Sequence, residues 1–201
     1  DTESQAFYFQ ENTELLKQTL IENERKEKLR RIMKSPTTEN TLSTRFGIEL
    51  TYPSAYKTFK DTTNFVWIQK EVRKGHLNLI AYTLKENILE GSFNERILNI
   101  RDSIGKAYVP GRLDGSYQIT ERAFRPYFYR AIVDGKQAYL TKGTWEVAND
   151  YMAGPFVNYM IQDTLKNRIL VVEGFVFAPT ASKRDYMFEL NTIINTLKQV
   201  D

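Results

Sequence analysis

The sequence contains no cysteine, and His76 is the only histidine among its 201 residues. Disulfides, thiolate metal sites and a cysteine nucleophile are therefore excluded, and a histidine-rich metal centre cannot form from one imidazole. No apolar run approaches the roughly 18 residues that a membrane-spanning helix needs. No Gly-rich phosphate loop and no Gly-x-Ser-x-Gly elbow is present. We therefore expect no metal, no cofactor and, on balance, no enzymatic activity.

The composition is that of a folded chain: 41% of the residues are hydrophobic, 13% are aromatic and 26% are charged. The 28 basic and 25 acidic residues leave a net charge of +3, which gives no strong electrostatic footprint for nucleic acid. The length fits one large domain, or one domain with an appended helix. Asp1 is not an initiator methionine and no signal peptide follows it, which indicates a processed or truncated piece.

Residues 3–34 are predicted to form a long helix, because they contain no glycine or proline and place leucine and isoleucine at helical spacing. The middle of this helix is polar on all sides, so only its two ends have obvious apolar faces to bury. A segment rich in turn formers begins at Ser35-Pro36 and ends the helix. We therefore divide the chain into an N-terminal helix and linker, 1–40, and a domain, 41–201.

The sequence of the domain predicts an α+β fold. Alternating or apolar segments predict strands, Ser92 and Ser182 begin two helix-capping patterns, and Asp134-Gly135 is a strong hairpin signal. The predicted strands are 46–52, 64–70, 77–83, 117–133, 136–147, 156–161 and 168–177, and the predicted helices are 92–108 and 182–197. We expect an antiparallel sheet of about seven strands covered by these two helices. Placed on opposite faces, they would form an α-β-α sandwich like that of PsbP- and Mog1-type domains, an analogy of architecture only.

Glu173 is the most informative acidic residue, because it lies within an apolar strand, where an unpaired carboxylate costs several kcal/mol. An arginine partner is the simplest way to offset the cost of burying this carboxylate. We therefore favour a structural ion pair over a catalytic role for Glu173. The candidate partners are Arg101, Arg122, Arg125 and Arg130. Other acids near strand ends could form a hydrolytic carboxylate pair, which would need a separation of about 5 to 9 Å; they are Asp102, Asp114, Glu121, Glu146 and Asp150.

Two further segments invite a binding interpretation. Residues 122–130 interleave three arginines with four aromatic residues, as single-strand nucleic-acid binders do, but a structural strand with arginine stems lying on it explains them better. Residues 143–156 are rich in turn formers and aromatic residues and read as a connection that lines an apolar pocket or a partner surface. The predicted binding residues, with Glu173, are Trp145, Tyr151, Met152, Pro155 and Phe156.

Several ordered blocks give the chain a family resemblance. They are Arg101-Asp102-Ser103, Val109-Pro110-Gly111, Asp114-Gly115-Ser116-Tyr117, Gly143-Thr144-Trp145-Glu146-Val147, Tyr151 to Val157, Val172 to Pro179 and Lys183-Arg184-Asp185-Tyr186. Together they resemble a domain-of-unknown-function family of Gram-negative bacterial envelope proteins, typically lipoproteins. The resemblance implies that this chain is the C-terminal part of a larger, lipid-anchored protein on the periplasmic side of the envelope. It supplies no catalytic residues.

We therefore expect a non-catalytic envelope domain that binds a partner protein or an envelope component, and that meets a membrane only through an upstream lipid anchor. Replacing Trp145 or Tyr151 with alanine is expected to leave the fold intact and remove an interaction. The alternative is a small-ligand or glycan-binding protein, or a hydrolase using Glu146, Asp150 or Glu173. Nucleic-acid binding ranks third, and the oligomeric state is left open.

Overall fold

A computed structural model of the chain describes residues 2–86 and 93–200, and for residues 2–11 the backbone alone. The helices are α1 (Thr2–Ile32), α2 (Thr41–Phe46), α3 (Phe93–Tyr108), the 3-10 helix η2 (Thr164–Lys166) and α4 (Arg184–Ile194). The strands are β1 (Ile48–Glu49), β2 (Lys57–Thr62), β3 (Phe65–Val72), β4 (Gly75–Lys85), β5 (Gln118–Thr120), β6 (Tyr127–Val133), β7 (Lys136–Val147), β8 (Asp150–Asp163), β9 (Arg168–Phe177) and β10 (Lys198–Gln199).

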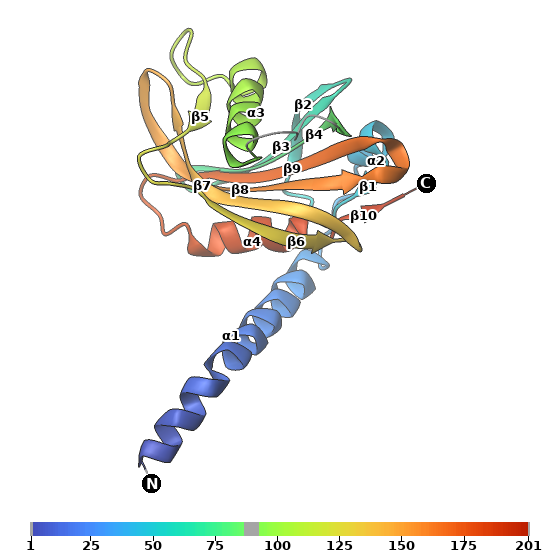
Figure 1. The fold of residues 1–201 in the computed structure, drawn as a ribbon. Helices are drawn as coiled ribbons and strands as arrows, with labels where there is room; N and C mark the ends of the chain where they lie inside the picture. Colours follow the sequence, from blue (N-terminus) through green and yellow to red (C-terminus); the bar gives the residue numbers. More distant parts are fainter. Residues whose placement is uncertain (1, 87–92, 201) are drawn as a thin grey trace.

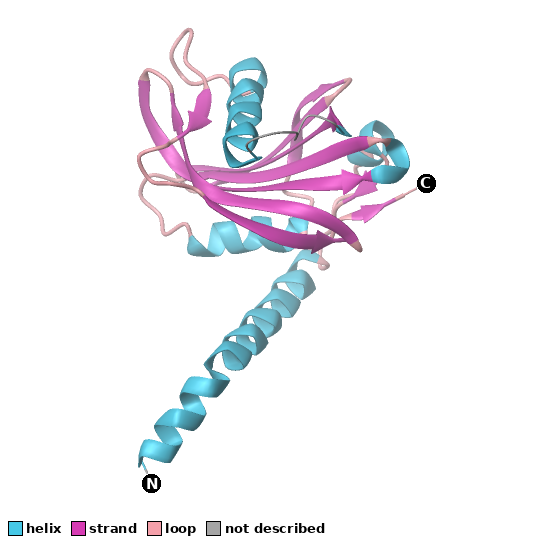
Figure 2. Ribbon diagram, viewed as in Figure 1, coloured by secondary structure: helices cyan, strands magenta, loops and turns pink. Residues whose placement is uncertain are grey.

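The predicted antiparallel sheet is confirmed, with eight strands rather than about seven. Its order is β2-β3-β4-β9-β8-β7, and both β5 and β6 pair with β7 at the far edge. β1 and β10 form a separate two-stranded sheet. Figures 1 and 2 show the strongly twisted sheet with α3 on one face and α4 on the other, so the expected α-β-α arrangement is also confirmed.

Two hydrophobic cores lie on the two faces of the sheet, because successive side chains along a strand point in opposite directions. In β9, Val172 and Val176 belong to the core under α4, whereas Val171 and Phe175 belong to the core under α3. Gly174 brings α4 close to the sheet, because a Cβ atom there would meet Leu190 Cβ at 2.9 Å. The core of the molecule is thus a filled three-layer sandwich.

The Asp134-Gly135 hairpin is confirmed. The φ angles of these two residues are +50° and +73°, as a two-residue turn between twisted strands requires. The Asp134 carboxylate also accepts hydrogen bonds from the Lys198 ammonium and the Gln199 backbone N–H, both at 2.9 Å. The turn is therefore attached to the C-terminal strand β10.

The predicted strand at 46–52 is wrong for most of its length. Phe46 ends α2, Gly47 adopts a left-handed conformation with its N–H bonded to the Ser43 carbonyl, and only Ile48–Glu49 pair as a strand. The alternation arose because Leu50 and its apolar neighbours are buried beside α2 without a sheet partner. β2 was missed because its side chains are exposed or half-buried throughout.

Two other predictions need correction. Residues 117–133 form two strands, β5 and β6, separated by a segment that contains Pro126, and proline cannot donate to a sheet ladder. The Ser182 capping pattern is not used: α4 is capped at Lys183, and no side chain bonds its first turn. The other pattern begins at Ser92, which lies outside the described residues. The helices after both patterns are confirmed.

The predicted N-terminal helix is also confirmed, and α1 projects from the domain (Figure 1). Its C-terminal end is anchored, since Ile32 is buried in the α4-side core and Glu24 pairs with Arg184. Among the described residues, no helix combines the length and hydropathy needed to cross a membrane.

The Asp163 side chain connects the ends of three neighbouring strands, β7, β8 and β9. Its carboxylate is fully buried at the end of β8 and accepts hydrogen bonds from Arg168 at 2.8 Å and Lys136 at 3.0 Å. Burial alone raises the pKa of this carboxyl, but the two cationic donors outweigh burial, so the pKa lies below its ordinary value.

This lowered pKa predicts a loss of stability in acid. The stabilisation is fully present above the pKa of the unfolded chain, about 3.9, and is lost as the pH falls through the lower folded pKa. Asp163→Asn should lower the free energy of unfolding by about 1.5–3 kcal/mol at pH 7 and flatten its decline in acid. Urea unfolding between pH 2 and 7 measures both effects. Asp114→Asn, a control at an exposed position, should change neither the free energy of unfolding at pH 7 nor its decline in acid. If the free energy of unfolding fell equally steeply in acid for Asp163→Asn and the native chain, the role given to Asp163 would be wrong.

Candidate functional site

Glu173 is held in a buried ion pair under α3. Arg101 of α3 donates from Nη2 to Glu173 Oε1 at 2.7 Å and from Nε to Oε2 at 3.0 Å. Asn158 adds a hydrogen bond to the carboxylate at 2.9 Å, and Arg101 Nη1 donates to the Thr120 hydroxyl at 3.0 Å. The guanidinium carbon lies 3.8 Å from the ring centroid of Phe156. The predicted ion pair is confirmed, with Arg101 as the partner.

The surroundings of this pair leave it no access to a substrate. Glu173 and Arg101 have 0% and 3% of their surfaces exposed. Burial first, and the Glu173 carboxylate second, raise the pKa of the adjacent Tyr82 hydroxyl, which therefore stays neutral. The arrangement is that of a structural polar network inside a core.

The other acids of the hydrolase alternative are mostly engaged in hydrogen bonds or ion pairs. Asp150 pairs with Arg112 at 3.0 Å, and Asp102 accepts from Arg122 and from the Thr120 backbone. Glu121 accepts two backbone N–H groups of the following turn. Within the described parts of the chain, no group of three or more histidine, cysteine or acidic residues could hold a metal ion.

The connection predicted at residues 143–156 is instead a tight hairpin between two long strands. β7 continues to Val147 and β8 begins at Asp150, because Asn149 adopts a left-handed φ of +66° that closes the turn. Trp145 is consequently buried, with its indole N–H donating to the Val176 carbonyl across the sheet at 3.2 Å. Glycine, proline and aromatic residues suggested a loop, but here they are the close-packing residues of paired strands.

The six predicted binding residues do not converge on one surface. Trp145, Phe156 and Glu173 are interior residues of the α3-side layer. Met152 packs against that same core, while Tyr151 is fully exposed at the hairpin tip. Pro155 and Phe156 also line a groove beside α4. The binding role of the six residues stays a prediction.

The arginines and aromatic residues of segment 122–130 do not all point to the same side of the sheet. Arg122 is held at 2.9 Å by Glu95, Asn99 and Asp102 of α3. In β6, Tyr129 faces the α4 side and Arg130 the opposite side, because neighbouring side chains of a strand alternate. Tyr129 and Arg130 therefore do not share one face of the sheet.

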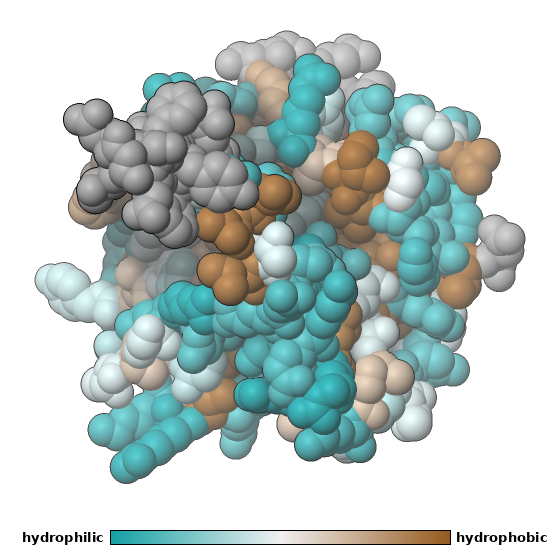
Figure 3. All heavy atoms as spheres, turned by 90° about the horizontal axis from the view of Figure 1, so that it is seen from below, coloured by the Kyte–Doolittle hydropathy of each residue, from teal (hydrophilic) through white to brown (hydrophobic). Residues whose placement is uncertain are grey.

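A groove of about 460 Å³ lies between α4 and the sheet, under β6, β7 and β8. The register places Tyr127, Lys142 and Val157 in one row across these strands, and Thr144 and Pro155 in the next row. These side chains share one face of the sheet, and the rows form the floor and outer wall of the groove. Figure 3, which views the molecule from the α4 side, shows apolar patches among hydrophilic residues on this face.

The inner wall of the groove comes from α4, where Met187, Phe188 and Asn191 face the cavity. α4 packs mainly on β9, with smaller contacts to β4 and β8, and part of the β6 and β7 face beside it stays exposed. Tyr127 and Tyr129 are accordingly 67% and 50% exposed. Apolar area of this kind, concave and bordered by aromatic rings, is characteristic of binding sites.

The charges at the mouth of the groove are basic. Lys142 has no carboxylate partner among the described residues, and its ammonium lies 5.6 Å from the ring centroid of Tyr129. Arg184 lines the other end, where it pairs with Glu24 and Asp185. An acidic group entering the groove would meet the Lys142 ammonium without displacing an existing ion pair.

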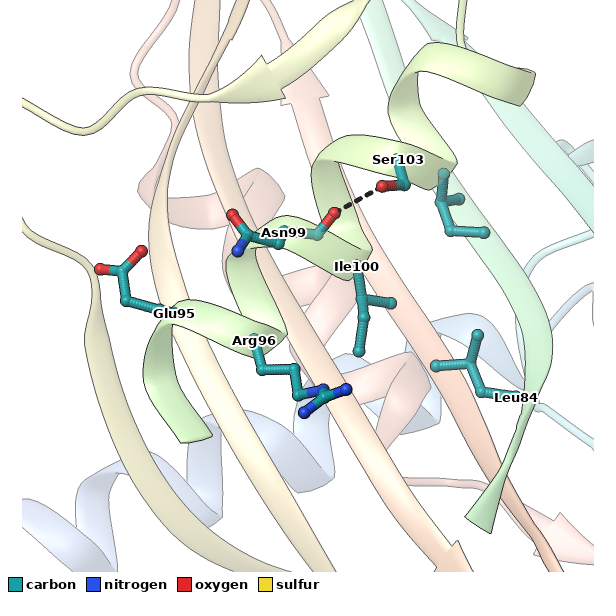
Figure 4. A pocket seen from close by; sticks show the side chains of 7 residues that line it. Leu84, Glu95, Arg96, Asn99, Ile100 and Ser103 are labelled. Carbon is teal, nitrogen blue, oxygen red and sulfur yellow. Dashed lines mark hydrogen bonds between the residues drawn. The ribbon is translucent and has the colours of Figure 1, made fainter. Parts of the chain in front are cut away.

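A second hollow, of about 580 Å³, lies beside α3 (Figure 4). Leu84 and Ile100 form its apolar side, and Ser103 donates its hydroxyl hydrogen to the Asn99 carbonyl. Glu95 on its rim is engaged by Arg122. Its polar groups are thus used within the chain, and the α4 groove is the better candidate site.

The sequence of this domain matches a protein family. Residues 35–196 match the family described as "Domain of unknown function (DUF4837)". The chain belongs to this family. The match begins just after α1, and it confirms the resemblance to an uncharacterised domain family. No curated protein matches the DUF4837 chain.

Solved structures add only a distant likeness. The Saccharomyces cerevisiae Ran-binding protein Mog1p is 12% identical, with a TM-score of 0.48 over 77% of the DUF4837 chain and 91% of its own chain. A point mutant of Mog1 is 11% identical, with a TM-score of 0.44 over 77% and 92% of the two chains. Values this low carry no functional argument.

Sequence reasoning missed the groove residues other than Pro155 and Phe156. Tyr127, Lys142 and Met187 come from three separate segments, and nothing in their local patterns links them. The one available signal was in the α4 segment, where Met187 and Phe188 widen the apolar face toward its N-terminal end.

Proposed function

We propose that this DUF4837 domain is a non-catalytic binding domain of the bacterial cell envelope, and that it holds a partner in the groove beside α4. One observation carries the proposal. α4 leaves part of the β6 and β7 sheet face exposed, around Tyr127 and Tyr129, and the groove there is lined largely by apolar and aromatic side chains. An uncovered layer of this kind offers a partner the place that a second helix takes in a complete sandwich.

The groove also specifies the chemistry of its partner. The partner presents apolar side chains to Met187, Phe188 and Tyr127, and an acidic group to the unpaired Lys142. An amphipathic helix lying alongside α4 meets both requirements, as in helix-in-groove recognition. Its acidic edge would give selectivity and speed association more than it would add affinity.

Catalysis is not part of the proposal. The buried acid Glu173 is engaged by its ion pair with Arg101, and none of the described residues that line the groove carries a carboxylate. Lys142 and Arg184 are the charged residues of this lining, and two cations do not make the acid–base pair that hydrolysis needs.

A small anionic amphiphile is the second candidate ligand. The groove volume of about 460 Å³ lies within the roughly 300–1,000 Å³ typical of small-molecule sites. Its apolar lining, with the Lys142 ammonium outside any ion pair among the described residues, suits a ligand with an apolar body and an acidic head. The two candidates share one site and differ only in the size of what occupies it.

The envelope location is proposed from the resemblance of the ordered sequence blocks. The full-length protein is expected on the periplasmic side, attached by an acylated cysteine upstream of residue 1. Membrane fractionation and metabolic labelling with a fatty acid test this part separately from the groove.

The groove is tested first with 8-anilinonaphthalene-1-sulfonate, an anionic apolar dye. The dye is expected to bind with enhanced fluorescence, and Lys142→Glu should weaken binding about tenfold, equivalent to about 1.4 kcal/mol. Thr144→Trp should abolish binding by filling the groove, while Leu165→Trp, a matched change at an exposed turn residue, should not. Equal dye binding by all four chains, each shown to have an unchanged melting temperature, would overturn the site.

The partner class is tested in the envelope of the source bacterium. A photoreactive phenylalanine derivative at Met187 should give a specific protein adduct, and the same derivative at Leu165 should not. Loss of the adduct in the Lys142→Glu background would support a protein partner with an acidic edge. Dye binding without any adduct would support the small amphiphile, and failure of both experiments would refute groove binding.

A further inference from the structure

A second surface is left uncovered on α1, away from the groove. Every described side chain from Glu14 to Asn23 is exposed, including four large apolar ones. Leu15, Leu16, Leu20 and Ile21 are 62%, 47%, 68% and 47% exposed. Leu16 and Leu20 lie one turn apart on the same face, and the other two flank that face on either side.

The helix has too little contact with the domain to be stabilised by it. Its 31 residues span about 46 Å at ~1.5 Å per residue, and its ion pairs with the domain start at Glu24, followed by Lys28 and then the buried Ile32. Isolated helices are marginal in water, because most helical stability comes from packing an apolar face. The four apolar side chains of Leu15, Leu16, Leu20 and Ile21 are therefore left uncovered by the domain.

The charges along α1 are divided between its two ends. Residues 2–24 contain five glutamates and one lysine, whereas residues 25–32 contain five basic residues and one glutamate. Two copies of such a helix repel each other at both ends when parallel. When antiparallel, the acidic part of each copy lies along the basic part of the other.

We propose that the α1 helix pairs with α1 of a second copy of this chain in an antiparallel arrangement centred near Gln18. This centre sets Leu16 of one copy against Leu20 of the other in both directions at once, while Leu15 and Ile21 lie to either side of that contact. The interface is isologous and closes as a two-fold dimer. The two domains lie at opposite ends of the helix pair.

The orientation follows from the charges as well as from the apolar residues. Glu14 and Glu22 already pair with Lys17 and Arg25 within the helix, so like charges near the centre are compensated. Lys26 has no ion pair among the described residues, and antiparallel pairing turns it toward the acidic part of the second copy. Rim charges of this kind set orientation and salt dependence.

Analytical ultracentrifugation of the 201-residue chain tests the association. The native chain is expected to sediment as a dimer at micromolar concentration, and Leu16→Glu with Leu20→Glu should give a monomer with an unchanged melting temperature. Leu165→Glu, the matched exposed control on the domain, should remain dimeric. A native monomer across the concentration range, or a dimer that survives the double substitution, would overturn the proposal.

The absence of native cysteine makes the orientation directly measurable. Thr13→Cys and Asn23→Cys should form a mixed disulfide when the two chains are combined, because these positions face each other in the antiparallel pair. Neither chain alone should crosslink efficiently. Self-crosslinking of each single variant, without the mixed product, would refute the antiparallel pairing in favour of a parallel one. None of these outcomes depends on what the groove binds.

Discussion

Replacing Arg101 with methionine is expected to lower the free energy of unfolding by about 3–5 kcal/mol, because breaking a buried ion pair leaves one charge uncompensated. Glu173 is fully buried, and Asn158 would be its one remaining side-chain donor. Methionine keeps the stem volume of arginine and its contact with the Phe156 ring, so little of the loss arises from packing. Urea unfolding at pH 7 measures it.

The double variant Arg101→Met with Glu173→Met separates the charge from the fold. Replacing both partners by apolar side chains of similar size is often neutral or stabilising, so the double variant should lie within about 2 kcal/mol of the native chain. Arg122→Met, which breaks a partly exposed ion pair, should cost less than about 1 kcal/mol. If Arg101→Met lowered the free energy of unfolding no more than Arg122→Met does, the ion pair of Arg101 and Glu173 would not be the buried network described above.

Trp145→Ala is expected to lower the free energy of unfolding by about 3–5 kcal/mol, the range for truncating a buried aromatic side chain. The indole packs edge-on against Phe175 with the ring centroids 5.9 Å apart, and its N–H satisfies the Val176 carbonyl. This expectation replaces the earlier one, drawn from the sequence, that the substitution would spare the fold and remove an interaction.

The adjacent position Gly154 offers a second test of the same packing. A Cβ atom there would lie 2.1 Å from the Val176 carbonyl oxygen and 3.0 Å from the Trp145 indole nitrogen. Thermal melting should therefore show destabilisation in both Trp145→Ala and Gly154→Ala. Tyr151→Ala, at the exposed hairpin tip, should change stability by less than about 0.5 kcal/mol. A native melting temperature for Trp145→Ala would restore the surface interpretation of this tryptophan.

The features that the sequence predicted well are local ones. Asp134-Gly135 predicts its turn because two adjacent residues can adopt the φ angles that the turn needs. Glu173 predicts a buried partner because its own strand is apolar. The α3 and α4 helices follow from periodicity within a single segment. Each of these depends on neighbours within a few residues, which is the range that a pattern reports.

The features that were missed depend on contacts between distant segments. Glycine and proline beside Trp145 indicate a turn in isolation, but in the sheet Gly154 is the residue over which the indole reaches β9. β2 carried no apolar alternation because it is an edge strand. The groove exists only because α4 covers part of a wide sheet, and no single segment encodes how much of that face remains open.

The attachment of Asp134 to the C-terminal strand has a consequence for the groove. The β6–β7 hairpin forms the outer wall, and a free hairpin at a sheet edge would sample many positions and lose that freedom on binding. Hydrogen bonds from Gln199 and Lys198 lower the pKa of the Asp134 carboxyl, so it remains ionised and holds the hairpin at neutral pH. The wall is thus preorganised, and less conformational entropy is lost when a partner enters. The last residues of the chain, far from the groove in sequence, thereby contribute to how tightly it can bind.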